Sequence, residues 1–244
     1  MKEADNELKI VTSDEEITFS QYMNRLNELL RDCLREEYLA EIFIPFFRMC
    51  CPEGVKIIPI FDDRRSGPKT DNETVFKDRM KKICALKDDG SYTVPDYIFV
   101  SEEYTVSNPI KPYLMVETKM PRTLKDGKYY RPLHDSLNDI KIKDELISEI
   151  KFCGIVIYTD GIYWMFLTLN DKGEVMSLPG YETISLVTLK DKYYSTYYAT
   201  IKEDVKHCDL SEIGLGEFDV ITEPKEWKEL KKSINRLLVE AKKL

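Results

Sequence analysis

The feature that most constrains the fold is an apolar run at residues 152–158, followed by a second at residues 162–167. Nearly unbroken apolar runs of this length are typical of strands covered on both faces. The intervening Thr159-Asp160-Gly161 predicts a tight turn, so the two runs form a hairpin. The pair therefore predicts a strand near the centre of a sheet with helices on both sides.

Other segments supply the remaining elements. Further strands are predicted at residues 55–61, 94–100, 112–119 and 184–189. Apolar residues at helical spacing predict one long helix or two, broken at Pro45, over residues 22–50, and helices over 74–86, 135–151 and 224–244. The predicted fold class is α/β, with a mixed, twisted central β-sheet of about five strands flanked by helices and with a C-terminal helix.

The chain has 244 residues, which predicts one large domain. We expect a flexible acidic N-terminus at 1–17, an α/β domain at 18–205 and a C-terminal helical extension at 206–244 that packs on the core or mediates self-association. No run of 18 apolar residues and no secretory signal peptide is found. The six cysteines lack paired zinc spacing. These features predict a cytoplasmic protein with reduced thiols and no membrane contact.

Two of the predicted strands carry carboxylates. Asp96 follows Pro95 in the run 94–100, and Glu117 lies two residues before Lys119. Alternate side chains of a strand share a face, so Glu117 and Lys119 point the same way. If the two strands are neighbours, Asp96 lies beside Glu117 at one end of the sheet. Two carboxylates and one ammonium at one place suit a hard divalent cation with a lysine beside it.

Pro95-Asp96 and Glu117-Thr118-Lys119 resemble the motif of the PD-(D/E)XK nuclease superfamily. The later order of helix, strand, Thr-Asp-Gly turn and strand with Trp164 is similar to the N-terminal nuclease domains of type I restriction motor subunits and their stand-alone relatives. The resemblance covers roughly residues 30–168. It implies a restriction-endonuclease-like core and a Mg²⁺-dependent hydrolase, with Mn²⁺ as an alternative, that cuts phosphodiester bonds in DNA in restriction or phage–host conflict.

The resemblance also implies roles for single residues. Asp96 and Glu117 would hold the metal, and the carbonyl of Thr118 would be a further oxygen ligand. Lys119 would be catalytic, orienting the attacking water and stabilising the charge on the phosphorane.

Members of the superfamily carry a glutamate on their first core helix. Glu37 is the favoured match over Glu36 and Glu41, because it continues an apolar helix face. The alternative is that this glutamate forms a surface salt bridge with Arg31 or Arg35.

The relatives often carry Gln-Leu on the helix after the motif. This chain has Glu145-Leu146 there, which speaks against a site role for Glu145. The sequence predicts Glu145 and Glu149 as polar residues decorating that helix.

Basic residues gather directly after the motif. Together with Lys119, the sequence has Arg122, Lys125, Lys128 and Arg131, with Tyr129 and Tyr130 between the last two. This composition suits a nucleic-acid backbone, and it equally suits a solvated loop. The net charge of −8 is unlike that of a nonspecific nucleic-acid binder, so such contacts would be local. The expected partner is DNA, with RNA as an alternative, and a homodimer would allow both strands to be cut.

Two other classes of function stay open. The fold could be a catalytically silent module that binds nucleic acid or a protein partner, although the presence of Asp96, Glu117 and Lys119 favours the enzyme. In a structural protein, Pro95-Asp96 would be an ordinary turn, and Asp96 and Glu117 would lie far apart. The sequence has no phosphate-binding Gly-rich loop, no dinucleotide fingerprint and no Gly-x-Ser-x-Gly elbow, which excludes the chemistries that need them.

Overall fold

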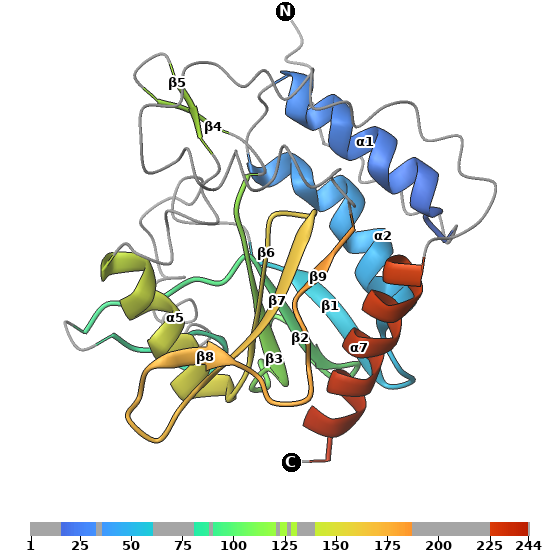
Figure 1. Cartoon of the computed structure of the whole chain (residues 1–244). Coiled ribbons are helices and arrows are strands. Elements are labelled where there is room, and N and C mark those ends of the chain that lie inside the picture. Colours follow the sequence, from blue (N-terminus) through green and yellow to red (C-terminus); the bar gives the residue numbers. More distant parts are fainter. Residues whose placement is uncertain are drawn as a thin grey trace, which may run out of the picture.

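The computed structural model describes residues 16–32, 36–60, 81–87, 90–120, 123–125, 128–130, 140–186 and 225–243. These residues form a mixed seven-stranded sheet with helices on both faces (Figure 1). The predicted α/β class is confirmed, and the sheet has two more strands than expected.

The elements have the following bounds. The helices are α1 (Phe19–Asp32), the 3-10 helix η1 (Glu36–Leu39), α2 (Ala40–Cys50), α5 (Ile140–Cys153) and α7 (Lys225–Ala241). The strands are β1 (Val55–Pro59), β2 (Tyr97–Ser101), β3 (Leu114–Thr118), β4 (Thr123–Lys125), β5 (Lys128–Tyr130), β6 (Val156–Thr159), β7 (Tyr163–Leu169), β8 (Val175–Ser177) and β9 (Ile184–Ser185).

The strand order in the large sheet is β1-β2-β3-β6-β7-β8, and β9 also pairs with β7. Strands β3 and β6 are parallel, whereas the other pairs are antiparallel. Antiparallel neighbours can be joined by short turns, but a parallel pair needs a crossover, and α5 lies in the connection between β3 and β6. The motif strand β3 is therefore central, with β2 on one side and β6 on the other.

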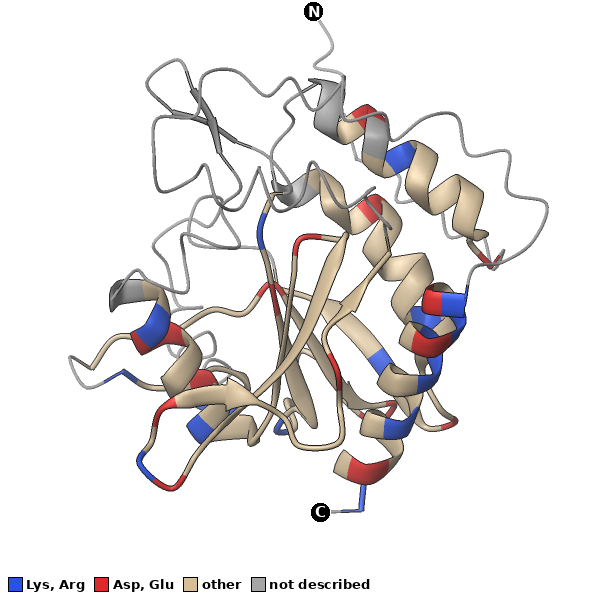
Figure 2. Ribbon diagram, in the orientation of Figure 1, with Lys and Arg blue, Asp and Glu red and all other residues tan. Residues whose placement is uncertain are grey.

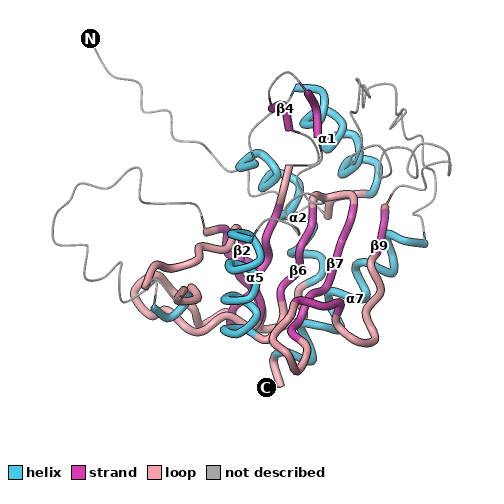
Figure 3. Tube along the Cα trace, turned by 60° about the vertical axis from the view of Figure 1, so that its left-hand side comes forward, coloured by secondary structure: helices cyan, strands magenta, loops and turns pink. Residues whose placement is uncertain are grey.

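The sheet separates two hydrophobic clusters. Leu114 and Val116 of β3 face the larger cluster, which contains α1, α2 and α7, whereas Met115 faces the smaller one beneath α5. Figure 3 shows α5 over one face of the sheet, with α2 and α7 on the other. Because side chains alternate along a strand, Glu117 belongs to the α5 face.

Aromatic rings dominate the larger cluster. The ring of Phe46 lies 4.7 Å from that of Trp227 and 5.2 Å from that of Trp164. Helix α7 buries one side in this cluster and carries its charged residues on the outer side (Figure 2). Its apolar side is thus occupied by the chain's own core and is not available for self-association.

The break between the first two helices differs from the prediction. Pro45 lies inside α2, and the chain instead passes through η1 before α2 begins. A proline inside a helix costs about 3 kcal/mol. The buried residues of α2, including Phe43, Phe46 and Phe47, supply the packing that offsets this cost.

The predicted strand at residues 152–158 begins later than expected. Helix α5 continues to Cys153, and β6 starts at Val156. Gly154 has a φ of +87°, and its N–H donates to the carbonyl of Ile150 at 2.6 Å. A glycine in this left-handed conformation is a common helix end, so the glycine in the apolar run marked the boundary.

Other predictions fall partly outside the description. Residues 33–35, 61, 74–80, 135–139, 187–189, 224 and 244 of predicted elements, and the N-terminus to residue 15, are not among the described residues. Strand β8 was not predicted. The stretch after the motif, for which a solvated loop was one of two interpretations, contains the antiparallel pair β4 and β5.

Candidate functional site

The register of β2 and β3 brings the two motif carboxylates together. Tyr97 pairs with Val116 and Ile98 with Met115 in antiparallel register, so Asp96, one residue before β2, is opposite Glu117. The carbonyl of Asp96 accepts a hydrogen bond from the N–H of Ile60 at 2.8 Å, which continues the sheet beyond β2. Asp96 and Glu117 are therefore neighbours, as expected. The alternative interpretation, in which the two acids lie far apart, is wrong.

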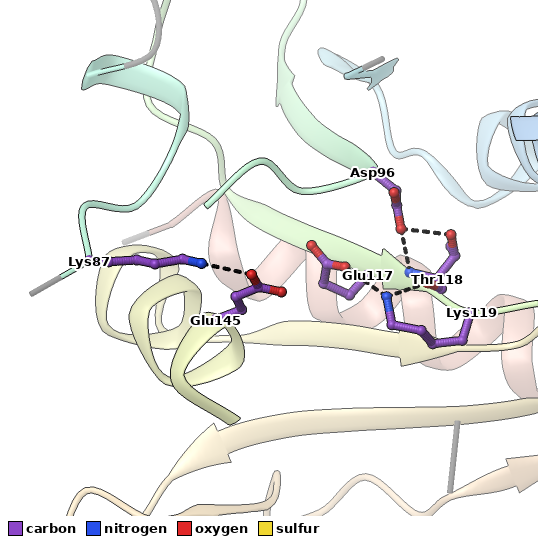
Figure 4. A network of polar contacts seen from close by, with 6 residues as sticks. All are labelled: Lys87, Asp96, Glu117, Thr118, Lys119 and Glu145. Carbon is purple, nitrogen blue, oxygen red and sulfur yellow. Dashed lines mark hydrogen bonds and ion pairs between the residues drawn. The ribbon is translucent and has the colours of Figure 1, made fainter. Parts of the chain in front are cut away.

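Thr118 holds the carboxylate of Asp96 (Figure 4). Its N–H and its hydroxyl both donate to Oδ2 of Asp96, at 2.6 and 2.7 Å. Thr118 is buried at the end of β3, so these two hydrogen bonds to one oxygen fix the carboxylate at the end of the sheet.

Lys119 lies on the same side as Glu117, as the strand period predicts. Its Nζ is 3.5 Å from Oε2 of Glu117 and donates to the carbonyl of Thr118 at 2.9 Å. The N–H of Lys119 donates to the carbonyl of Thr159 at 2.9 Å, continuing the pairing with β6. The carbonyl expected as a metal ligand is thus a hydrogen-bond acceptor for Lys119 in this structure.

A polar pocket of about 350 Å³ opens beside the motif. Its wall comes from the end of β3, from α5 and from the segment that leads to Asp96. The lining residues are Lys87, Ser91, Tyr92, Thr93, Val94, Asp96, Glu117, Lys119, Glu145 and Glu149.

Two glutamates of α5 reach this pocket, and neither was expected there. Glu145 forms an ion pair with Lys87, with 2.7 Å between Oε1 and Nζ. Glu149 is fully buried, and within the described part of the chain neither of its carboxylate oxygens has a hydrogen-bond partner. The prediction that Glu149 decorates an exposed side of the helix was wrong. The available signal was its position three residues after Leu146, which faces the core.

The carboxyl groups of Glu117 and Glu149 resist ionisation because they are buried. Burial, and then the charges of Glu149 and Asp96, raise the pKa of Glu117 well above its ordinary value, and Lys119 opposes this shift. Burial raises the pKa of Glu149 as well, to about 7. The two glutamates are thus electrostatic neighbours, although the contact between them does not have hydrogen-bond geometry. A cation in the pocket would relieve both shifts.

The candidates on the first helices have other surroundings. Glu37 lies in η1, and its side chain is not among those that the structure describes. Its role as a metal ligand therefore stays a prediction. Glu41 at the start of α2 is exposed and forms an ion pair with Arg25 of α1, which also contacts Glu28. The salt bridge considered as the alternative exists for Glu41, with a partner other than Arg31 or Arg35.

The basic stretch after the motif is described in part. Lys125 of β4 and Lys128 of β5 are register partners in the short hairpin. The side chains of both lysines, and the whole of Arg122 and Arg131, lie outside the described residues. Their predicted contact with nucleic acid stays a prediction.

The side chains that line the pocket include possible ligands for a cation. Among the residues that the structure describes, no three or more His, Cys, Asp or Glu side chains are arranged to hold a metal ion. The chemistry of the donors nevertheless suits a hard cation, because Asp96, Glu117 and Glu149 offer oxygen ligands alone. The buried carboxylate of Glu149 without a partner points the same way. The residues therefore fit Mg²⁺ by chemistry.

Comparisons of the chain with models of protein families, with curated proteins and with solved structures found no match. None of the described helices is long and apolar enough to cross a membrane.

Proposed function

We propose that the protein is a metal-dependent nuclease that hydrolyses phosphodiester bonds in DNA. The observation that carries the proposal is the register of β2 and β3, in which Asp96 is opposite Glu117 and Lys119 lies on the Glu117 side of a polar pocket. This arrangement joins the two halves of the motif that resembles the PD-(D/E)XK superfamily.

Asp96 and Glu117 would hold Mg²⁺ or Mn²⁺, with the predicted Glu37 and the Thr118 carbonyl as further ligands. A bound divalent cation lowers the pKa of a coordinated water and offsets the charge of the phosphate. The chain's own residues do the positioning. Thr118 holds Oδ2 of Asp96 through two hydrogen bonds, so the carboxylate is already oriented before a ligand binds.

Lys119 supplies the positive charge at the reacting phosphate. Its side chain is 20% exposed, and the carbonyl of Thr118 and the carboxylate of Glu117 hold its ammonium at the pocket. An ammonium fixed at this position can donate to the phosphate oxygens as negative charge develops on them.

The DNA backbone would extend from the pocket to the basic stretch containing Arg122, Lys125, Lys128 and Arg131. RNA is the alternative substrate. Cutting both strands of a duplex would call for a homodimer, and restriction or phage–host conflict is the setting that the resemblance implies.

A cleavage assay tests the proposal. Linear, circular and single-stranded DNA are incubated with Mg²⁺, Mn²⁺ or EDTA, and the wild type is compared with Lys119→Met. Lys172→Met is the matched control, because Lys172 is an exposed lysine in the turn before β8. We expect metal-dependent cleavage by the wild type and the control, and a loss of at least about 100-fold in Lys119→Met. A wild type that binds DNA without cutting it would refute the enzyme and favour the silent binding module.

A further inference from the structure

Glu149 has an environment that sets it apart in the described part of the chain. It is the one acidic residue there whose carboxylate is fully buried with no hydrogen-bond partner on either oxygen. Asp160 is equally buried, but its Oδ1 accepts from the N–H groups of Ile162 and Tyr163. A buried carboxylate without a partner is unfavourable unless something compensates its charge.

The lysines of the pocket are engaged elsewhere. Lys87 pairs with Glu145 at 2.7 Å, and Lys119 lies against Glu117 and the carbonyl of Thr118. The carboxylates of Asp96, Glu117 and Glu149 line the same pocket, and the ion pairs of the two lysines are with Glu145 and Glu117. A divalent cation in this pocket would offset the charge of the acids beside it.

A second buried polar group lies in the same pocket. The hydroxyl of Thr93 makes no hydrogen bond of regular geometry within the described residues, although it is close enough to Glu149 to lower the pKa of that carboxyl, and both residues line the pocket. Native proteins rarely leave two such groups in one place unless a ligand or water satisfies them. The buried polar groups of Glu149 and Thr93 are therefore available to bind a ligand in the pocket.

We propose that Glu149 of α5 binds a divalent cation together with Glu117, so that the site takes a ligand from the helix as well as from the strands. The inference rests on the proposed function and goes beyond it, because position 149 belongs to neither half of the motif. The helix packs on β3 and β6, so the ligand comes from a rigid element. The oxygen-only donors favour Mg²⁺ or Mn²⁺ over softer metals.

The test is a titration of the full-length protein with MnCl₂ at pH 8, followed by calorimetry and by thermal unfolding. The variants are Glu149→Gln, Glu149→Asp and Glu117→Gln. Asp144→Asn is the matched control, because Asp144 is an exposed acid of the same helix and does not line the pocket. We expect Glu149→Gln to weaken Mn²⁺ binding by at least about tenfold, since even outer-shell partners are worth that much. Glu149→Asp, which keeps a carboxylate, should retain part of the affinity, and Asp144→Asn should change it by less than about threefold.

The outcomes separate this inference from the proposed function. Wild-type affinity in Glu149→Gln, with binding lost in Glu117→Gln, would overturn the role of Glu149 and leave the strand site intact. No Mn²⁺ binding by the wild type at millimolar concentration would overturn the inference, whatever the cleavage assay gives. Mn²⁺ binding that depends on Glu149 in a protein that never cuts DNA would support the inference and refute the nuclease. The unfolding temperature of each metal-free variant shows that it is folded.

Discussion

Removing the charge of Glu149 is expected to stabilise the metal-free protein. Glu149→Gln keeps the size and shape of the side chain and imitates the protonated acid. Burial raises the pKa of Glu149 from its ordinary 4.5 to about 7, so the folded protein opposes ionisation of this group. For a carboxyl group with a raised pKa, the folded state binds more protons than the unfolded state between these two values. Stability therefore falls as the pH rises from 4.5 to about 7, and the loss is complete above that pH.

The size of the effect follows from the shift. One pKa unit corresponds to about 1.4 kcal/mol, so the full shift costs the wild type about 3 kcal/mol at pH 8. At pH 5.5 the folded protein keeps its proton and the unfolded chain has mostly lost it, and the cost is about 1 kcal/mol. The advantage of Glu149→Gln should therefore grow by about 2 kcal/mol between pH 5.5 and pH 8.

Urea unfolding in EDTA at the two pH values measures this difference. Glu145→Gln is the control, because the side chain of Glu145 is 42% exposed and its ion pair with Lys87 is worth at most about 1 kcal/mol. A Glu149→Gln protein that is no more stable than the wild type at pH 8 would refute the reasoning. It would mean that the carboxylate is compensated in the metal-free protein.

Three further predictions concern the same region. Thr118→Val removes the hydroxyl that donates to Asp96 and should lower the free energy of unfolding by about 2 kcal/mol in urea titrations, whereas Thr118→Ser should keep most of it. Gly161→Ala should cost at least about 2 kcal/mol more than Gly173→Ala in thermal unfolding. Both glycines have positive φ, but a Cβ at Gly161 would lie 3.2 Å from the hydroxyl of Tyr22, and one at Gly173 meets nothing within 4 Å. Adding Mg²⁺ should raise the unfolding temperature more at pH 8 than at pH 5.5, because protons compete for the buried carboxylates, and an equal rise at both pH values would argue against a site in this pocket.

The strands and the motif could be predicted because their signals are local. The period of two along a strand fixes which side chains share a face, and it put Lys119 on the side of Glu117. The tight turn at Thr159-Asp160-Gly161 was visible in its residue types, and the hydroxyl of Thr159 accepts from the N–H of Gly161 at 2.9 Å. The pairing of two neighbouring strands is then enough to place Asp96 beside Glu117, so this prediction did not depend on the helices.

The rest of the site depends on packing that the sequence does not encode locally. The ion pair of Lys87 with Glu145 joins residues 58 positions apart, and no pattern links them. The burial of Glu149 could have been predicted, because Glu149 shares a helix face with the buried Leu146. Acidic residues are more often exposed, however, and the sequence was interpreted in that way. In α2, tertiary packing outweighed the usual effect of Pro45.

The register of β2 and β3 has a consequence for the loop between them. The alignment of Asp96 with Glu117 is set by paired strands, not by the number of residues from 102 to 113. The turn at Thr105 to Asn108, closed by the N–H of Asn108 on the Thr105 hydroxyl, is exposed to solvent. The chain should therefore accept an inserted epitope tag at this turn while Asp96 stays opposite Glu117.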